Sequence, residues 1–337
     1  ADYNTAVGVN ALSADTLGSN STALGYQALA TQNFTTATDS YNVAVGHQAG
    51  VQITTGIRNT AVGGLALDNE QAGGRNTAVG YATLTNQRST TATNSYNTAI
   101  GYEAGKSITS GLQNTLIGGL AGDALTDADN NVAMGYFALG ADTKGSKSVA
   151  IGVGTLENQN FTTATDSFNT ALGHQAGGQV TTGIKNTLIG GLAGDALTDA
   201  DFNVAIGYQA LSSDTLGSRS IAIGNGALFT QNFTTATASY NVAIGDSAGT
   251  AITTGVQNIL IGGRTADALT EGVSNLAIGD RALSADTLGS RSVALGDQAL
   301  EAQNFTTATD VYNTAVGAKA GTAITTGFYN TLIGGLA

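Results

Sequence analysis

The phrase Asn4-Thr-Ala-Val-Gly8 decides the fold of this chain, because close variants of it recur nineteen times, the last ending at Gly334. Successive closing glycines are separated by a 17-residue or a 21-residue step, in the repeating order 17, 17, 17, 21. Four units make a 72-residue super-repeat, except that the stretch from Gly46 to Gly101 is one 17-residue unit short. A fixed period of about 20 residues is typical of stacked repeat architectures.

Alternation within the phrase predicts a short β-strand in every unit. The residue before the closing glycine is aliphatic, Thr or an aliphatic residue stands two positions earlier, and Ala or Leu stands between them. Period-two alternation of β-favouring residues is typical of strands. We therefore expect an all-β parallel β-solenoid whose 17- and 21-residue coils stack ~4.8 Å apart. Residues 1–337 are expected to form a single continuous array of about nineteen coils. A helical solenoid competes with this interpretation, but the glycines and β-branched residues disfavour it.

Asparagine stands four residues before the closing glycine in fifteen units, and serine replaces it in the other four. Stacked at one corner of the coils, these amides can hydrogen-bond from coil to coil. Asparagine also tolerates the tight bend that a corner requires. We expect a structural ladder that includes Asn42, Asn59, Asn97, Asn114, Asn131, Asn169, Asn186, Asn203, Asn241, Asn258, Asn275, Asn313 and Asn330.

The composition disfavours several classes of protein. Only 11% of the residues are charged and the net charge is −12, which argues against a nucleic-acid partner bound through its phosphates. Cysteine is absent, so the chain has no disulfide and no thiolate metal site. No apolar run reaches the ~18 residues of a membrane helix, and we expect no direct membrane insertion of this segment. Both ends fall within a repeat, so we expect the chain to be a segment of a longer protein.

Two stretches, Ser148-Val-Ala-Ile-Gly152 and Asn203-Val-Ala-Ile-Gly-Tyr-Gln-Ala-Leu211, carry a family resemblance. The chain resembles the head repeats of YadA-like trimeric autotransporter adhesins and related phage tail-fibre β-solenoid repeats. Its 17- and 21-residue coils are longer than the typical coil of that family. The resemblance implies a left-handed β-roll in a homotrimer, intertwined or side by side. It further implies an extracellular adhesive fibre, anchored in an outer membrane through other regions or carried on a virion. Its partners would be its own copies and host-cell surfaces, extracellular matrix or glycans.

The small residues of the phrase give separate support for a trimer. A 17-residue coil encloses little volume, and we expect its bulky aliphatic pair on one side of the strand and the Ala column on the other. The Ala column would let another copy approach closely, and burial of that face would contribute about 25 cal/mol per Å². The alternative is that the small residues simply fit a thin single-chain core.

The best functional candidate is the four-residue extension that lengthens every 21-residue coil. Four extra residues cannot enter a stacked coil, so we expect them to bulge outward as a rib. Two aromatic residues flank hydroxyl groups there and could contact a surface or a glycan; the alternative is that the rings fold back to cover the base of the rib. The candidate contact residues are Phe34, Tyr41, Phe161, Phe168, Phe233, Tyr240, Phe305 and Tyr312.

Paired acidic residues on two turns are weak calcium candidates, since Ca²⁺ prefers clustered oxygen ligands. Solvated turn carboxylates are the competing interpretation, and no other metal site is expected. The residues concerned are Asp127, Asp129, Asp199 and Asp201.

No other feature predicts chemistry. His47 and His174 share one unit position with Asp246 and Ala318, which indicates a tolerant outward site. We expect no enzyme activity, no catalytic residues and no cofactor, because no carboxylate cluster is confined to one coil. A glycan-processing depolymerase remains the alternative from another class. A Thr column eight residues after most closing glycines raises an ice-binding alternative, but every fourth coil interrupts it.

Overall fold

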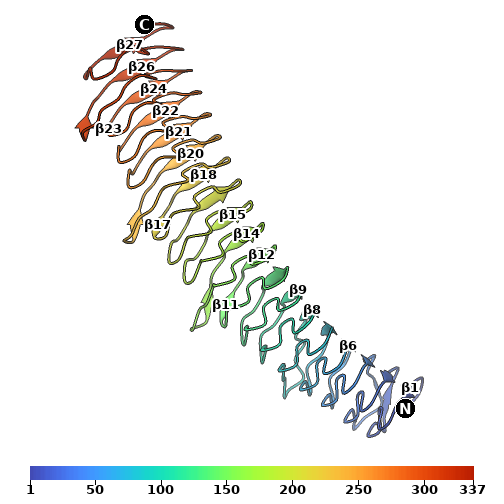
Figure 1. Ribbon diagram of the computed structural model, residues 1–337. Helices are drawn as coiled ribbons and strands as arrows, with labels where there is room; N and C mark the ends of the chain where they lie inside the picture. Colours follow the sequence, from blue (N-terminus) through green and yellow to red (C-terminus); the bar gives the residue numbers. More distant parts are fainter. The chain divides into compact units, whose positions relative to one another are not determined.

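The computed structural model describes residues 1–337 as an all-β chain without a helix. Nineteen three-residue strands, one in each repeat phrase, run parallel and stack as a β-solenoid of about nineteen turns. The predicted parallel solenoid is confirmed. The turns fall into two compact units, Ala1–Phe168 and Asn169–Ala337, and Figure 1 shows the strands stacked turn upon turn within each. Whether the whole chain is a single continuous array stays a prediction.

The first unit contains thirteen strands. Nine of them are the phrase strands, and the other four are two-residue strands, β2, β4, β11 and β13, which pair beside the extended coils. The strands are β1 (Thr5–Val7), β2 (Gly18–Ser19), β3 (Thr22–Leu24), β4 (Thr38–Asp39), β5 (Val43–Val45), β6 (Thr60–Val62), β7 (Thr77–Val79), β8 (Thr98–Ile100), β9 (Thr115–Ile117), β10 (Val132–Met134), β11 (Gly145–Ser146), β12 (Val149–Ile151) and β13 (Thr165–Asp166).

The second unit repeats the same plan with ten phrase strands and four two-residue strands, β17, β19, β23 and β25. The strands are β14 (Thr170–Leu172), β15 (Thr187–Ile189), β16 (Val204–Ile206), β17 (Gly217–Ser218), β18 (Ile221–Ile223), β19 (Thr237–Ala238), β20 (Val242–Ile244), β21 (Ile259–Ile261), β22 (Leu276–Ile278), β23 (Gly289–Ser290), β24 (Val293–Leu295), β25 (Thr309–Asp310), β26 (Thr314–Val316) and β27 (Thr331–Ile333).

Each phrase lies directly over the same phrase of the next coil. Ala205 pairs with Ala222, for example, in the register of β16 on β18. The closing glycine makes this stacking possible. Gly207 has a φ of +133°, and a Cβ there would overlap the carbonyl oxygen of Gly224 in the next coil. Only glycine combines that backbone angle with so close an approach, which explains why it closes every phrase.

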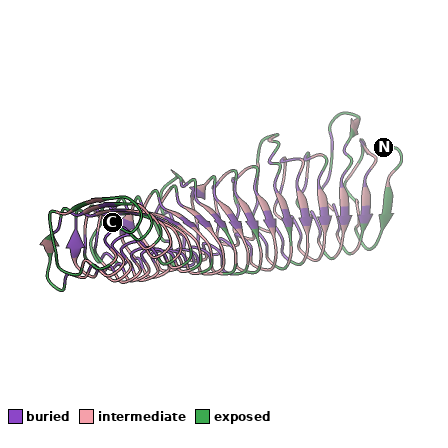
Figure 2. Ribbon diagram, turned by 90° about the horizontal axis from the view of Figure 1, so that it is seen from above, coloured by how far each residue is buried: buried purple, intermediate pink, exposed green.

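The two faces of the strands are the reverse of what we expected. The middle Ala or Leu is buried in every phrase strand except the terminal β1 and β27, and the Thr or aliphatic residues on either side of it are half-buried or exposed. Figure 2 shows this as purple at the centre of the arrows. The expectation that the Ala column forms an outer assembly face is therefore wrong, and the alternative of a thin single-chain core is correct. The interior of a 17-residue coil is narrow, and only the middle side chain of each strand, Ala or Leu, points into it.

Successive coils fill this narrow interior in different ways. In the coil that begins with the phrase ending at Gly190, Leu188 and Leu197 are both buried. Gly194 leaves the space that their methyl groups take. In the next coil, Leu211 is buried instead, while Ala205 stands where Leu188 stood. Exchanging large and small residues between facing positions keeps the core at native density.

A buried polar cluster replaces part of the apolar core in each super-repeat. Gln231 Nε2 donates to Asp214 Oδ2 at 2.6 Å and to Ser220 Oγ at 2.8 Å. Gln231 Oε1 accepts from Asn241 Nδ2 at 2.8 Å. The remaining oxygen of Asp214 accepts from two backbone N–H groups. Burial raises the pKa of Asp214, although hydrogen bonds from Gln231 and the backbone oppose the shift. Equivalent carboxylate–glutamine pairs are Asp15–Gln32, Asp142–Gln159 and Asp286–Gln303.

Between Gly46 and Gly101, where one coil is missing, a single residue supplies the carboxylate that this coil would have provided. The coil that would carry the aspartate is absent there, and the preceding coil has Glu70 at the position where its counterparts have Leu125 and Leu197. Glu70 Oε2 accepts from Gln87 Nε2 at 2.9 Å, and Oε1 accepts from three backbone N–H groups. A longer side chain therefore supplies the carboxylate that Gln87 requires.

The asparagine ladder is confirmed. Asn186 Oδ1 accepts from the backbone N–H of Asn203 in the next coil at 2.9 Å. Asn186 Nδ2 donates to the carbonyl oxygen of Ala200 in its own coil at 2.7 Å. The ladder asparagines other than the terminal Asn330 are almost fully buried, and they bond mainly to the backbone rather than to one another. Each amide thus joins two coils and pins one corner.

Candidate functional site

The extension of each 21-residue coil forms an outward rib, as expected. In the fourth of the five 21-residue coils, Thr234, Thr235 and Ala236 are exposed, and the chain then returns as β19, which pairs with β17 of the preceding coil. In Figure 1 the loops at β11, β17 and β23 extend beyond the neighbouring turns of their units. The rib is therefore held to the solenoid by its own two-stranded parallel ladder.

The phenylalanine that opens each rib is not a surface residue. Phe34, Phe161, Phe233 and Phe305 are only 6–7% exposed. The ring of Phe233 lies against Gly217 of the preceding coil, where any Cβ would collide with it. These four rings cover the base of the rib, so their proposed role as surface or glycan contacts is corrected. Apolar burial against the backbone of the neighbouring coil explains the difference.

The aromatic residue that ends each rib stays at the surface. Tyr41, Phe168, Tyr240 and Tyr312 are 42–52% exposed. Each immediately precedes a ladder asparagine, at a corner where the backbone is left-handed; Tyr240, for example, has a φ of 51°. We call the residues at this position of successive coils the edge column. In the second unit they are Lys185, Phe202, Arg219, Tyr240, Gln257, Ser274, Arg291, Tyr312 and Tyr329.

Aromatic and basic side chains alternate along parts of the edge column. The guanidinium of Arg219 lies 4.9 Å from the centre of the Phe202 ring and 5.8 Å from that of Tyr240. Lys185 stacks on the other side of Phe202 at 5.0 Å. Cation–π contacts of this kind contribute about 0.5–1 kcal/mol each at exposed sites. The sequence signal was a basic or aromatic residue at a 17- or 21-residue spacing, just before the ladder position.

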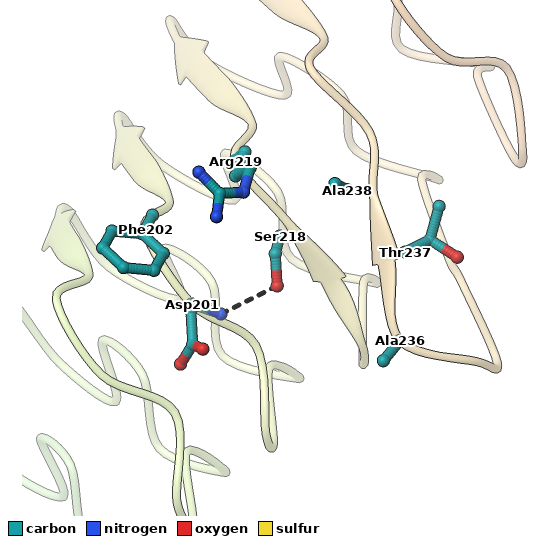
Figure 3. A pocket seen from close by; sticks show the side chains of 7 residues that line it. All are labelled: Asp201, Phe202, Ser218, Arg219, Ala236, Thr237 and Ala238. Carbon is teal, nitrogen blue, oxygen red and sulfur yellow. Dashed lines mark hydrogen bonds between the residues drawn. The ribbon is translucent and has the colours of Figure 1, made fainter.

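A shallow hollow opens between the rib of residues 233–240 and the edge column. It has a volume of about 200 Å³, and Arg219 lies at its rim beside Phe202, as Figure 3 shows. The Asp201 N–H donates to Ser218 Oγ at 2.9 Å on its wall. The rib contributes Ala236, Thr237 and Ala238 to its lining. The lining residues are Asp201, Phe202, Ser218, Arg219, Ala236, Thr237 and Ala238.

The calcium candidates hydrogen-bond within the chain. Asp201 Oδ1 accepts from the Ile184 N–H at 2.8 Å, and Asp199 Oδ1 accepts from Thr182 Oγ1 at 2.7 Å. The corresponding acids of the first unit, Asp129 and Asp127, accept from Leu112 N–H and Thr126 Oγ1. No group of three or more His, Asp or Glu side chains is arranged to hold a metal ion. These carboxylates cap neighbouring backbone or hydroxyl groups.

The histidines and the threonine column make contacts with neighbouring coils. His47 stacks on Tyr26 with ring centres 5.3 Å apart, and both His47 and His174 are exposed or half-buried at the surface. In the threonine column, Thr198 Oγ1 donates to the carbonyl oxygen of Thr215 in the next coil at 3.0 Å. The hydroxyls of this column thus add to the bonding between coils.

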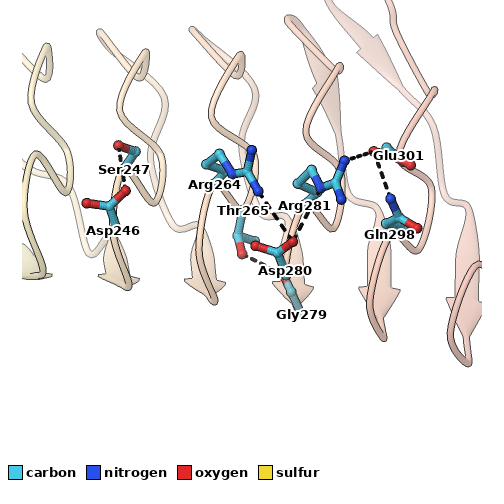
Figure 4. A network of polar contacts seen from close by, with 9 residues as sticks. All are labelled: Asp246, Ser247, Arg264, Thr265, Gly279, Asp280, Arg281, Gln298 and Glu301. Carbon is cyan, nitrogen blue, oxygen red and sulfur yellow. Dashed lines mark hydrogen bonds and ion pairs between the residues drawn. The ribbon is translucent and has the colours of Figure 1, made fainter.

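A charged corner in the second unit shows how far the outward positions vary. Arg281 lies 3.3 Å from a carboxylate oxygen of Asp280 and 3.4 Å from one of Glu301, and Arg264 reaches the same Asp280 at 3.7 Å, as drawn in Figure 4. In the first unit the same corner carries the stacked pair Tyr81 and Tyr102. Exposed ion pairs contribute about 0–1 kcal/mol each, so this network is no strong indicator of a site.

The outward face of the phrase strands is a repeated uncharged surface. Val204 and Ile206 flank the buried Ala205 on β16 and point away from the core. Equivalent side chains on the other phrase strands are Thr, Val, Ile, Leu or Met, and none is charged. We call these two rows the aliphatic face, although Thr holds the first position of the strand in ten of the nineteen coils. Several of its residues are strongly exposed, including Ile100 at 38%, Leu172 at 45% and Ile259 at 41%.

Comparison with known proteins identifies no relative: no family model, no curated protein and no solved structure matches the chain. The structure contains no helix long and apolar enough to cross a bilayer.

Proposed function

We propose that the chain is a structural segment of an extracellular or virion fibre, in which copies associate through the aliphatic face. The observation that carries the proposal is the exposure of two uncharged rows on the phrase strands of both units, one wholly apolar and one of Thr or aliphatic residues. Large apolar patches on a soluble chain mark interaction surfaces. Covering these rows is favourable by about 25 cal/mol for each Å² removed from water.

A second copy of the chain is the partner that fits this face best. The aliphatic rows recur in every coil, so a small globular partner would leave most of them in water. Another copy has the same rows at the same spacing and can match them coil for coil. The rows carry no charge in a chain of net charge −12, so contact there brings no like charges together. The resemblance to trimeric adhesin heads favours three copies.

The ribs and the edge column then supply the adhesive role. The ribs recur once in each super-repeat and the edge column has one residue in every coil, and together they present exposed aromatic and hydroxyl groups. Repetition of weak contacts raises avidity without any single tight site. The buried carboxylates support a structural role, since Glu70, Asp142 and Asp214 each accept hydrogen bonds that hold their own coil. The expected partners are host-cell glycans or extracellular matrix.

Sedimentation of the full chain tests the association. The wild type should sediment as three copies, while Val204→Asp combined with Ile206→Asp should weaken association at least tenfold, because two charges would enter the interface. The matched control places the same charges on an exposed rib, as Thr306→Asp with Thr307→Asp, and should sediment as the wild type does. A wild type that is monomeric at all concentrations would refute the proposal. Turnover of any host glycan by the chain would refute the non-enzymatic role.

A further inference from the structure

The five ribs are not equivalent in charge. Just before its last two residues, each rib has one position that faces a polar residue of the edge column across the rib base. That position is an aspartate in three ribs, an asparagine in one and an alanine in the remaining one. The residues are Asp39, Asn94, Asp166, Ala238 and Asp310.

Where the rib has a carboxylate at this position, the carboxylate contacts the polar residue of the edge column that faces it. Asp166 Oδ2 lies 2.6 Å from Lys147 Nζ, and Asp310 Oδ1 accepts from Arg291 Nε at 2.9 Å. In the first rib Asp39 Oδ1 accepts from Asn20 Nδ2, also at 2.9 Å. A carboxylate therefore recurs at one place relative to the edge column.

The rib of residues 233–240 leaves this place empty. Arg219 stands at the edge-column position of Lys147 and Arg291, but Ala238 replaces the aspartate, and the hollow of Figure 3 opens there. The Arg219 side chain is exposed and makes no ion pair or hydrogen bond; its contacts are with the rings of Phe202 and Tyr240. The Asp201 carboxylate points away from it in Figure 3 and accepts from the Ile184 N–H.

We propose that the hollow beside Arg219 binds the carboxylate of an external ligand. The bound group would take the place that Asp166 and Asp310 occupy in the sister ribs. Guanidinium groups bind carboxylates through parallel N–H···O bonds, and the Phe202 and Tyr240 rings already hold the Arg219 side chain in position. Binding involves no covalent step. It is independent of self-association, because no residue of the hollow belongs to the aliphatic face.

The charge of the chain restricts the ligand. A net charge of −12 repels polyanions, and Asp201 adds a negative group to the lining. The site therefore suits a single carboxylate on an otherwise neutral molecule. Acidic sugars and simple organic acids share that chemistry, and glucuronate and acetate represent the two sources. An exposed Arg–carboxylate contact is weak and salt-sensitive, so we expect a dissociation constant in the millimolar range.

Ligand-observed NMR titration of the full chain with glucuronate tests the site, with glucose as the uncharged control. Wild type should bind glucuronate at one site and glucose at least tenfold more weakly. Ala238→Asp recreates the Thr-Asp pair of the sister ribs, so it should fold normally, and it should weaken glucuronate binding at least tenfold. Arg219→Gln should do the same. If acetate binds as tightly as glucuronate, the carboxylate alone is recognised. If glucuronate binds more tightly, the sugar makes a further contact. Both results support the proposal.

A gain-of-site variant makes the test independent of any loss of folding. Asp310→Ala should free Arg291 and double the glucuronate bound at saturation. Undiminished binding to Ala238→Asp, equal binding of glucose, or no second site in Asp310→Ala would each overturn the proposal. Since sedimentation reports on the aliphatic face alone, failure here leaves the proposed self-association intact.

Discussion

Two small residues control this fold at the scale of single side chains. The closing glycine lets the backbone of one coil touch that of the next, and the buried Ala lets the strand lie close to the opposite wall. Leucine replaces that Ala only where a glycine has made room, as Gly194 does for Leu188. The middle residue of each phrase therefore points inward as Ala, or as Leu where a glycine leaves space for it.

The glycine argument predicts unequal effects of two alanine substitutions in neighbouring coils. Gly207→Ala should destabilise the chain by several times more than the ~1 kcal/mol that a left-handed alanine costs, because its Cβ would overlap the Gly224 carbonyl oxygen. Gly226 also has a positive φ, of 61°, but a Cβ there meets nothing within 4 Å, so Gly226→Ala should cost only about 1 kcal/mol. Thermal unfolding midpoints measure both, and equal shifts would contradict the stacking argument.

Half-buried aspartates predict an increase in stability toward acid pH. Burial raises the pKa of Asp195, and one of its oxygens is buried without a hydrogen-bond partner. The folded chain therefore holds a proton on Asp195 more tightly than the unfolded chain does. The resulting contribution to stability is fully present below the ordinary pKa of an aspartate, which the unfolded chain retains. It is lost as pH rises through the raised pKa of the folded chain.

Asp195→Asn should therefore raise the unfolding midpoint at pH 7 and make it less dependent on pH. The matched control is Asp199→Asn in the same coil, which removes the same charge from an exposed residue. It should leave the pH dependence of the midpoint close to that of the wild type. A flatter pH profile in the control than in Asp195→Asn would count against the desolvation argument.

At the scale of the coil, the super-repeat is an alternation of core chemistries. Apolar coils with Leu or Ile at the inner corner follow one another, and then an aspartate coil and a glutamine coil share a satisfied polar cluster. Buried polar groups are costly unless they are hydrogen-bonded, and here the donors and acceptors come from adjacent coils. The identity of each coil therefore depends on its neighbour.

Glu70→Leu tests that dependence, because leucine is the residue of the sister coils at Leu125 and Leu197. The apolar residue should nevertheless destabilise this coil by roughly 1–3 kcal/mol, since Gln87 and three backbone N–H groups would lose their acceptor. Hydrogen exchange of the Gly73 and Ser89 amides, which donate to Glu70, should accelerate. Amides near Leu197 in the same protein provide the internal reference. Unchanged exchange at Gly73 and Ser89 would show that these amides do not need Glu70.

The sequence predicted the repeated features well and the paired features poorly. Strands, the asparagine ladder and the ribs follow from residues that recur at one spacing, so periodicity is sufficient evidence for them. Alternation defines two faces but does not say which points inward, and the rule that bulky residues face the core failed because the coil is too narrow. The Asp214–Gln231 cluster and the edge column depend on side chains that meet across adjacent coils. The residues of each pair are separated in sequence by one coil length, and this spacing was the only sequence signal of their contact.

At the scale of the whole molecule, the chain separates its scaffold from its variable surface. The ladder and the sequence of core types recur in both units, whereas the outward corners change from aromatic pairs to ion pairs. Under the proposed function, copies would associate through the aliphatic face, as the sedimentation experiment tests. Differences between ribs, such as Ala238 against Asp310, would then change binding at individual coils without altering assembly.

The Glu70–Gln87 pair also limits how such a gene can change length by recombination. Near-identical repeats recombine readily, but a glutamine coil must follow a coil that brings a carboxylate. Gain or loss of a whole super-repeat preserves that order automatically. Loss of one 17-residue aspartate coil preserves it only if the coil before it acquires an acidic residue, as Glu70 does here. Viable descendants should therefore differ in length by whole super-repeats, and a shorter step should carry a compensating point mutation.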